Sequence, residues 1–384
     1  MMGIKKVVVV FPYRFRDFDW QRFELDYLAP HVEIHVHELI GALTPEFGAA
    51  YGSQSENPAV KRFASLKEWR KEFKKISENA IVFNHVRPIN LKSTLICVTL
   101  RRSGAKIVGF SVGGVPNYAS ADGVGQKHLE MVLKKLFHFF KRNALSMTSA
   151  QLVLVGGSEE VLRVKRDFFR TTKICVANSS DFSMTIKSTS RPQLQRVESV
   201  FLDTGFPGFL RDELLSGKPE LVKASEWYPN LMKFFHFVET NVGLETTIAS
   251  HPKHDGRDHS EFFGARKIVG GQTLGLVRSS QLVIATNSTS ISFVVAFSKP
   301  LILVTCDAIE QAQQPKKFEI KSCSAETGAR IFNIDREYTE QDLREAMVID
   351  HAKYESYKRK YLTSRTDGKP NYQVLLDEVI FAED

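Results

Sequence analysis

The chain has 384 residues, which at roughly 150 residues per domain predicts two or three domains. Hydrophobic residues make up 43% and charged residues 25% of it, the balance of an ordinary globular protein. That balance excludes a mainly disordered chain, a collagen-like chain and a disulfide-stapled miniprotein. Lys and Arg together number 52 against 44 Asp and Glu, a net charge of +8. The excess favours an anionic partner: nucleic acid, a phospholipid surface, or a phosphorylated or carboxylated substrate.

The cysteines and the N-terminus indicate the compartment. The four cysteines form no CxxC pair, and Cys97 and Cys175 lie in apolar runs, where a thiol behaves as a small buried hydrophobe. We therefore expect a reduced, cytoplasmic protein without structural zinc. The apolar run at residues 7–11 is short and is followed by Pro12, so we expect no signal peptide. No stretch approaches the roughly 18 apolar residues of a membrane span, so any contact with the inner membrane is expected to be peripheral.

In the first half of the chain, short β-branched runs alternate with longer amphipathic segments. Continuous apolar strands separated by helices are typical of a parallel sheet covered on both faces, so this half is predicted to be Rossmann-like. The predicted strands are 6–11, 32–36, 79–84 and 106–110, and the predicted helices are 17–28 and 90–102.

The second half repeats the alternation. Two α/β halves of similar size are typical of a two-domain enzyme with a cleft between its lobes. The expected domains are 1–190, 191–350 and a helical end at 351–384 that packs back on the first domain, with helices beginning near Thr339. The predicted strands are 199–202, 245–250, 282–285 and 300–304, and the predicted helices are 228–241 and 290–297.

Polar residues follow two of these strands. Strand 245–250 is followed by a His-Pro-Lys sequence, and strand 282–285 by a Thr-Asn-Ser-Thr-Ser cluster that opens a helix. Ligands bind at the carboxyl ends of strands in an open α/β sheet, and such a cluster offers N–H groups and hydroxyls to a phosphate. The alternative is that the cluster only caps the helix. The candidate anion-binding residues are His251, Lys253, Asn287, Ser288, Thr289 and Ser290.

The order of these motifs resembles that of GT-B glycosyltransferases of bacterial surface-polysaccharide synthesis. It runs from His251-Pro252 through Ser279-Ser280 and the cluster at 287–290 to Lys299-Pro300. The similar branch uses CMP-activated acidic sugars and includes retaining Kdo transferases and bacterial sialyl- and polysialyltransferases. The resemblance covers residues 248–307.

The resemblance implies a fold, a donor and a set of roles. It implies an α/β GT-B fold, with two Rossmann-like domains facing a cleft and C-terminal helices. It implies that the second domain binds a CMP-sugar such as CMP-Kdo, and that the first binds a glycan or lipid-linked glycan acceptor of O-antigen or capsule synthesis. The CMP phosphate and ribose would then be held by His251, Ser288 and Thr289, with Lys253, Asn287 and Ser290 beside them.

Sugar transfer through an oxocarbenium-like centre needs carboxylates. Asp203 follows strand 199–202, and similarity to retaining Kdo transferases makes it the candidate nucleophile. The alternative is that Asp203 organises a turn. Glu130, near the start of a predicted helix, is a candidate acid/base on the acceptor hydroxyl, although a first-turn glutamate also suits the helix dipole.

The first half offers candidate acceptor-binding residues. Gly113 and Gly114 follow strand 106–110 and permit close backbone approach, but they form no GxGxxG dinucleotide motif. Arg14 and Arg16 follow the first strand and could bind an acidic sugar or a phosphorylated acceptor, and the His85–Arg87 stretch has the same standing. Solvated loop side chains are the alternative.

Two basic stretches invite a different interpretation. In residues 133–142, apolar side chains recur at helical spacing, which favours a core-facing helix with a basic outer face over a lipid-binding or nucleic-acid-binding surface. Residues 67–75 are interpreted in the same way.

The sequence therefore predicts a transferase that needs no metal or other cofactor. No DxD triplet is assigned to a metal-bridged nucleotide site, and retention through Asp203 is the preferred outcome. The alternatives are an inverting sialyltransferase-like enzyme, a UDP- or GDP-sugar transferase of the same architecture, a nucleic-acid-binding protein, and a scaffold with a degenerate site. Nucleic acid is disfavoured, because the sequence carries no RRM, helix-turn-helix or zinc-finger signature.

Overall fold

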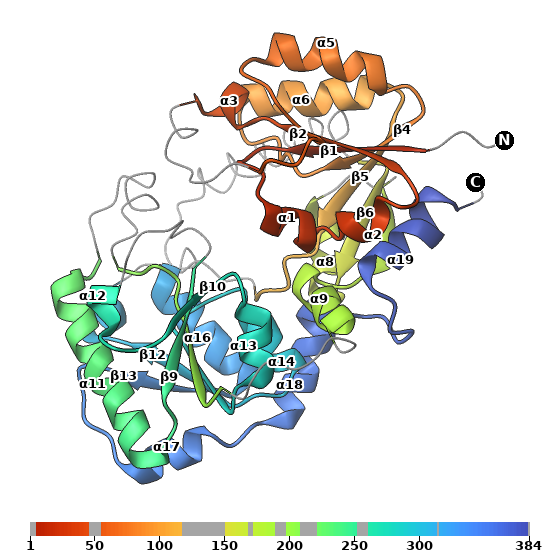
Figure 1. The fold of residues 1–384 in the computed structure, drawn as a ribbon. Coiled ribbons are helices and arrows are strands. Elements are labelled where there is room, and N and C mark those ends of the chain that lie inside the picture. The colour runs from red at the N-terminus through yellow and green to blue at the C-terminus, as the bar shows by residue number, and fades with distance from the viewer. Residues whose placement is uncertain are drawn as a thin grey trace, which may run out of the picture. The chain divides into compact units, whose positions relative to one another are not determined.

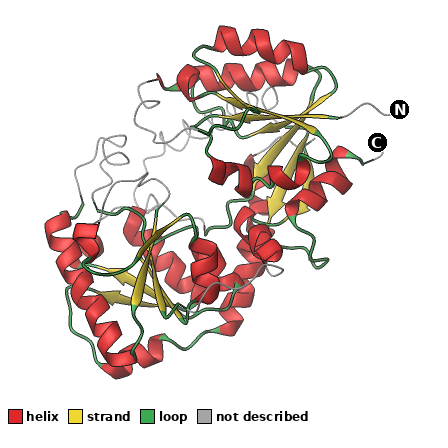
Figure 2. Ribbon diagram, viewed as in Figure 1, coloured by secondary structure: helices red, strands yellow, loops and turns green. Residues whose placement is uncertain are grey.

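The computed structural model describes residues 5–45, 55–116, 150–167, 172–188, 197–207, 221–251, 260–312 and 315–382 (Figure 1). These residues form two compact units. The first unit contains the chain up to Gly114, the described residues between Ala150 and Ile186, and the chain from Lys360 onward. The second unit contains Lys187–Arg359 together with Val115 and Pro116. Each unit contains a parallel sheet flanked by helices (Figure 2). The predicted domain limits stay predictions, because residues 189–196 lie outside the described ranges.

The described strands of the first unit form a seven-stranded sheet in the order β3-β2-β1-β4-β5-β6-β7, with every pair parallel. The order reverses between β1 and β4, which makes this the switch point of a doubly wound fold. The elements are β1 (Lys6–Phe11), α1 (Asp17–Arg22), α2 (Leu25–Leu28), β2 (Glu33–Glu38), α3 (Ile40–Leu43), β3 (Val60–Arg62), α5 (Leu66–Ile76), β4 (Ala80–Asn84), α6 (Leu91–Arg102), β5 (Lys106–Ser111), β6 (Leu152–Gly156), α8 (Ser158–Asp167), β7 (Lys173–Ala177), α9 (Ser180–Ser188), α19 (Asn371–Leu375) and the π-helices η2 (Lys358–Leu362) and η3 (Leu376–Ile380).

Strand β1 shows why the first unit has a core on each face of its sheet. Successive side chains of a strand point to opposite faces, so Val7 and Val9 enter one core while Val8 and Val10 enter the other. All four are fully buried, and each contributes about 1.5–3 kcal/mol relative to an exposed position. Helices α5 and α6 cover one face, and Trp69 of α5 packs there (Figure 1).

The helix predicted over 17–28 is two helices, α1 and α2. The break falls at Glu24, whose backbone is left-handed with a φ of 58°. The Glu24 carboxylate is buried and accepts hydrogen bonds from the Ser183 hydroxyl and from the Tyr372 backbone N–H at 2.7 Å. Hydrogen bonds to two distant segments therefore hold the Glu24 side chain inside the protein, and the helix is interrupted at this residue.

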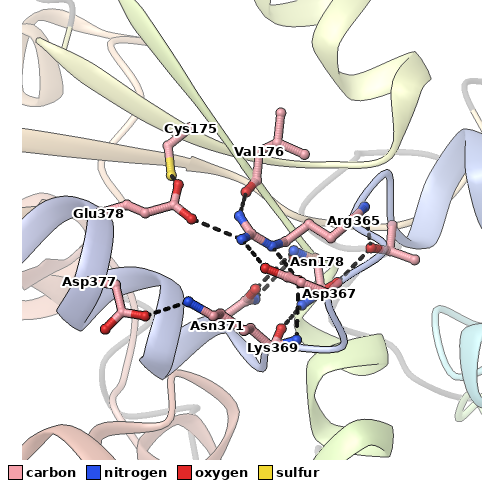
Figure 3. A network of polar contacts seen from close by, with 10 residues as sticks. Cys175, Val176, Asn178, Arg365, Asp367, Lys369, Asn371, Asp377 and Glu378 are labelled. Atoms are coloured by element: carbon pink, nitrogen blue, oxygen red, sulfur yellow. Dashed lines mark hydrogen bonds and ion pairs between the residues drawn. The ribbon is translucent and has the colours of Figure 1, made fainter.

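The C-terminal segment is tied to the end of β7 by the polar network in Figure 3. Asn178 donates to the Lys369 carbonyl at 2.8 Å, and its side-chain oxygen accepts from the Thr363 hydroxyl at 2.6 Å. Arg365 donates to the Val176 carbonyl at 2.6 Å and pairs with Glu378 at 2.9 Å. Val374 and Val379 complete the attachment by entering the first unit's core.

The described strands of the second unit form a six-stranded parallel sheet in the order β10-β9-β8-β11-β12-β13. Here the switch point lies between β8 and β11. The elements are β8 (Ser199–Leu202), α11 (Ala224–Val242), β9 (Thr246–Ser250), α12 (Ser260–Phe263), β10 (Ile268–Gly270), α13 (Thr273–Ser279), β11 (Leu282–Ala285), α14 (Ile291–Ala296), β12 (Leu301–Thr305), α15 (Asp307–Gln311), α16 (Pro315–Thr327), β13 (Arg330–Asn333), α17 (Glu340–Ala346) and α18 (His351–Tyr357).

Cys97 and Cys175 are buried, as predicted, and so are Cys306 and Cys323; all four thiols are free. Burial raises the pKa of Cys97 and Cys306 to about 11 and that of Cys175 and Cys323 to about 12. Separately, none of the helices in the described ranges is both long and apolar enough to cross a membrane.

Candidate functional site

Three neighbouring strands of the second unit end in polar residues. The register pairs Leu202 of β8 with Ala249 of β9 on one side and with Ala285 of β11 on the other. The residues that follow these strands, Asp203, His251 and the 286–290 cluster, therefore start at the same edge of the sheet. This edge includes the switch point between β8 and β11, where an open α/β sheet leaves room for a ligand.

Asp203 is almost fully buried, with 6% of its surface exposed. Its backbone N–H donates to the Ala249 carbonyl at 3.1 Å, and its Oδ1 accepts from the Gly205 N–H at 2.8 Å. The turn-organising alternative is therefore observed. Burial of the Tyr228 hydroxyl raises its pKa, and the nearby charge of Asp203 raises that pKa further. The candidacy of Asp203 as a nucleophile stays a prediction.

The polar cluster after β11 is joined to the residues after β8. The hydroxyls of Thr286 and Thr204 lie 3.4 Å apart. The Ser288 hydroxyl accepts from the Ser290 N–H at 3.2 Å, inside the turn that precedes α14. Ser290 is the N-cap residue, but its side chain makes no capping hydrogen bond, and α14 begins one residue later than predicted. Thr289 is exposed and Ser288 half-buried, so hydroxyl groups line this turn.

Asn287 has a partner that the sequence did not reveal. Its side-chain amide donates to the carboxylate of Glu319 on α16, and burial raises the pKa of Glu319. The other amide atom, Oδ1, is buried and has no hydrogen-bond partner in the part of the chain that the structure describes. Lys316, one turn before Glu319, places its ammonium 3.9 Å from the centre of the Phe206 ring, near Asp203 in the chain.

Of the remaining candidate residues, the structure describes His251 but not Lys253 or Glu130. His251 is half-buried directly after β9. Lys253 lies outside the described residues, and so does Glu130, the candidate acid/base. The structure thus gathers His251, Asp203 and the 287–290 cluster at one sheet edge, and adds Thr204, Thr286 and Glu319.

In the first unit, Arg14 and Arg16 are engaged by carboxylates of their own unit. The Nε atom of Arg14 lies 3.9 Å from Glu38 Oε1, and only 11% of its side chain is exposed. The Nε atom of Arg16 donates to the Asp19 carboxylate at 3.4 Å, and the same carboxylate accepts from the Arg16 backbone N–H at 3.0 Å at the start of α1. Neither is a solvated loop arginine, and acceptor binding by either stays a prediction.

The two glycines of the predicted acceptor loop differ. Gly114 has a φ of +69°, and a Cβ there would lie 2.7 Å from the Cβ of Ser179, so the fold itself requires glycine. A Cβ on Gly113 would meet no atom of the described residues within 4 Å. Gly113 alone therefore keeps the open backbone that an acceptor loop needs.

The switch point of the first unit gathers three ionisable side chains. His85, after β4, is stacked between Phe23 at 4.3 Å and Phe110 at 4.7 Å, and burial with the nearby Arg22 charge lowers its pKa to about 3. Arg22 lies 4.0 Å from Asp181, whose pKa burial raises. The sequence pointed to His85 but not to Arg22 or Asp181, because these come from helices far apart in the chain.

Within the described ranges, no group of three or more His, Cys, Asp or Glu side chains is placed to hold a metal ion. The predicted independence from metal and cofactor stays a prediction.

The fold, unlike the sequence, can be matched to known proteins. No family model matches the sequence, and no curated protein matches it. A UDP-GlcNAc 2-epimerase from Methanocaldococcus jannaschii is similar over 97% of this chain and 98% of its own, with 11% identity and a TM-score of 0.50. The wall teichoic acid polymerase TagF is similar over 97% of this chain and 87% of its own, with 10% identity and a TM-score of 0.52. These likenesses show that the chain has the α/β GT-B fold, with two Rossmann-like units.

Proposed function

We propose that this protein is a glycosyltransferase that binds a nucleotide-activated sugar at the strand ends of its second unit. One observation carries the proposal: the residues after β9, β8 and β11 bring an imidazole, a carboxylate and a hydroxyl cluster to the switch point of a Rossmann-like sheet. The shared fold supports it, since the similar proteins include an epimerase named for UDP-GlcNAc and a polymerase whose crystals were soaked with CDPG.

The proposed roles follow from the chemistry of each group. The hydroxyls of Ser288 and Thr289 and the His251 imidazole donate to the phosphate of the nucleotide and stabilise its charge as the sugar leaves. Asn287 presents its buried Oδ1 to the donor, and Glu319 positions that amide. Lys253 and Ser290 complete the donor site.

Asp203 supplies the carboxylate of the reaction. In the preferred, retaining course, an Asp203 oxygen attacks the anomeric carbon while the bond to the phosphate breaks and its electrons leave with the nucleotide. An acceptor hydroxyl then displaces the carboxylate and loses its proton to a base, the role proposed for Glu130. In the inverting alternative, a carboxylate only takes the proton from the attacking hydroxyl.

The proposed donor is CMP-Kdo or a related acidic sugar, moved to a glycan of O-antigen or capsule synthesis. This choice rests on the motif order from His251 to Pro300. A UDP-sugar donor is the second candidate, and the likeness to the UDP-GlcNAc 2-epimerase favours it. Arg14, Arg16 and Gly113 are proposed for the acceptor side.

Thermal unfolding with added CMP, UDP or GDP tests the donor site. A ligand at one hundred times its dissociation constant stabilises the folded state by about 2.7 kcal/mol, which shifts the midpoint measurably. CMP is expected to stabilise the protein, and Ser288→Ala combined with Thr289→Val to abolish the shift, whereas Ser364→Ala, an exposed serine of the first unit, keeps it. Stabilisation by UDP alone would replace CMP with the second candidate. No shift with any nucleotide would contradict the site.

Asp203→Asn then tests the chemistry apart from binding. Asparagine keeps an oxygen for the Gly205 N–H, so the turn survives while the nucleophile is lost. The variant is expected to keep the CMP shift and to lose transfer of the sugar. An unchanged transfer rate would remove Asp203 from the mechanism.

A further inference from the structure

The net positive charge of this protein comes from one stretch of the first unit. Between Val60 and Arg102 the chain carries eleven Lys and Arg residues and three Glu residues, a net charge of +8. That equals the net charge of the whole chain, and outside the stretch the two kinds of charge balance at 41 each. All eleven basic side chains are exposed.

Eight of these eleven basic residues belong to the neighbouring helices α5 and α6. Helix α5 turns Trp69 and Phe73 inward, so its lysines and Arg70 lie on the outside. Helix α6 lies beside α5 on the same face of the sheet (Figure 1). The charge of Glu72 is already engaged, because the ammonium groups of Lys61 and Lys75 hold the pKa of its carboxyl at about 2.

Large apolar side chains are exposed among these basic residues. Ile89 is 82% exposed, Leu91 76% and Leu95 38%, and they lie before and along the first turns of α6. Leu91 and Leu95 are four residues apart and so share one face of the helix. Arg87 and Lys92, both exposed, flank them. We call Ile89, Leu91, Leu95 and the exposed Lys and Arg residues of 60–102 the basic–apolar surface.

We propose that the basic–apolar surface docks the protein on an anionic phospholipid bilayer, with Ile89, Leu91 and Leu95 entering the interface and the basic side chains contacting the headgroups. Each Lys or Arg near such a surface is attracted by anionic headgroups, and exposed aliphatic side chains gain free energy on leaving water. A nucleic acid would use the charge, but its bases stack on aromatic rings, and the exposed apolar side chains of this surface are aliphatic. The proposal goes beyond the donor site, which lies in the other unit.

Sedimentation of the full chain with lipid vesicles tests the docking. We expect binding to vesicles of phosphatidylcholine mixed with phosphatidylglycerol and at least about tenfold weaker binding to phosphatidylcholine alone. We also expect binding to weaken as salt rises, because the Debye length falls from about 10 Å at 0.1 M to about 3 Å at 1 M. Equal binding to both kinds of vesicle, or to neither, would overturn the proposal.

Paired variants locate the surface. Lys71→Glu with Lys74→Glu removes basic charge from α5, and Ile89→Ser with Leu91→Ser removes the apolar contacts. Each pair is expected to weaken binding to anionic vesicles by about tenfold or more. The matched controls are Lys233→Glu with Lys321→Glu, and Val348→Ser, which change exposed residues of the second unit.

The readouts separate this proposal from the donor site. All substituted positions are exposed, so unchanged unfolding midpoints are expected, and the stabilisation by nucleotide should survive in every variant. Loss of vesicle binding with the nucleotide shift intact supports the docking surface. Vesicle binding that the paired variants leave unchanged, or that the controls weaken equally, would overturn it. Tighter binding to an oligonucleotide than to anionic vesicles would reassign the surface to nucleic acid.

Discussion

The buried imidazole of His37 makes the stability of the first unit depend on pH. Its side chain is 1% exposed and lies edge-on to Phe63, with ring centres 5.0 Å apart. Its Nδ1 accepts a hydrogen bond from Trp69 Nε1 at 3.2 Å. That bond requires an unprotonated Nδ1, and burial lowers the pKa of His37 from 6.5 to about 4.

The direction of the effect follows from the depressed pKa. Between pH 6.5 and pH 4 the unfolded chain binds a proton at His37 and the folded chain does not, so stability falls as the pH falls. The contribution is fully present above pH 6.5. At pH 5 the two pKa values correspond to a loss of about 2 kcal/mol in the free energy of unfolding.

The variant His37→Asn isolates this contribution. Asparagine can keep an acceptor for Trp69 Nε1 but does not titrate, so the variant lacks the loss of stability that protonation of the unfolded chain at residue 37 causes at acid pH. Urea unfolding of both proteins at pH 7.5 and pH 5, followed by tryptophan fluorescence, gives the comparison. The stability advantage of the natural protein over the variant should shrink by about 2 kcal/mol at pH 5. An advantage that is the same at both pH values would refute the assignment of a buried, neutral His37.

Three further predictions concern packing. Gly114→Ala should cost about 2–3 kcal/mol, because it forces a left-handed backbone and a clash, whereas Gly113→Ala should stay within about 0.5 kcal/mol; urea unfolding measures both. Asn178→Ala should cost about 2–4 kcal/mol and expose the C-terminal segment to limited proteolysis, because buried hydrogen bonds to that segment are lost. A thiol reagent at pH 8 should modify the native protein slowly and all four cysteines after unfolding, since each thiol is buried with a raised pKa. Resistance of Asn178→Ala to proteolysis, or rapid labelling of the native protein, would contradict these accounts.

Much of the fold could be predicted from strands that are continuous apolar runs. Strands β1, β4, β5 and β12 are of this kind, and their alternation with helices predicted two Rossmann-like units. Strands β3 and β10 were missed because each has only three residues, and a run that short carries no pattern. Strands β6, β7 and β13 were not predicted either, although β6 is itself a continuous apolar run. The break of the predicted helix at Glu24 could not be predicted, because the hydrogen-bond partner of Glu24, Tyr372, lies 348 residues away in the chain.

The candidate site was predictable to the extent that it follows strand ends. Asp203 and His251 directly follow their strands and the 287–290 cluster begins two residues beyond β11, so the register of the sheet brings them to one edge. Glu319 was not predictable, because it reaches Asn287 from a helix 32 residues further along the chain. The same reason hid Arg22 and Asp181 beside His85.

A crystal structure of the protein with CMP bound tests the central claim most directly. The account predicts that the phosphate lies within hydrogen-bond distance of the His251 imidazole and of the Ser288 or Thr289 hydroxyl, with Asp203 facing the position of the departing sugar. A phosphate bound elsewhere in the second unit, or in the first unit, would contradict the donor site.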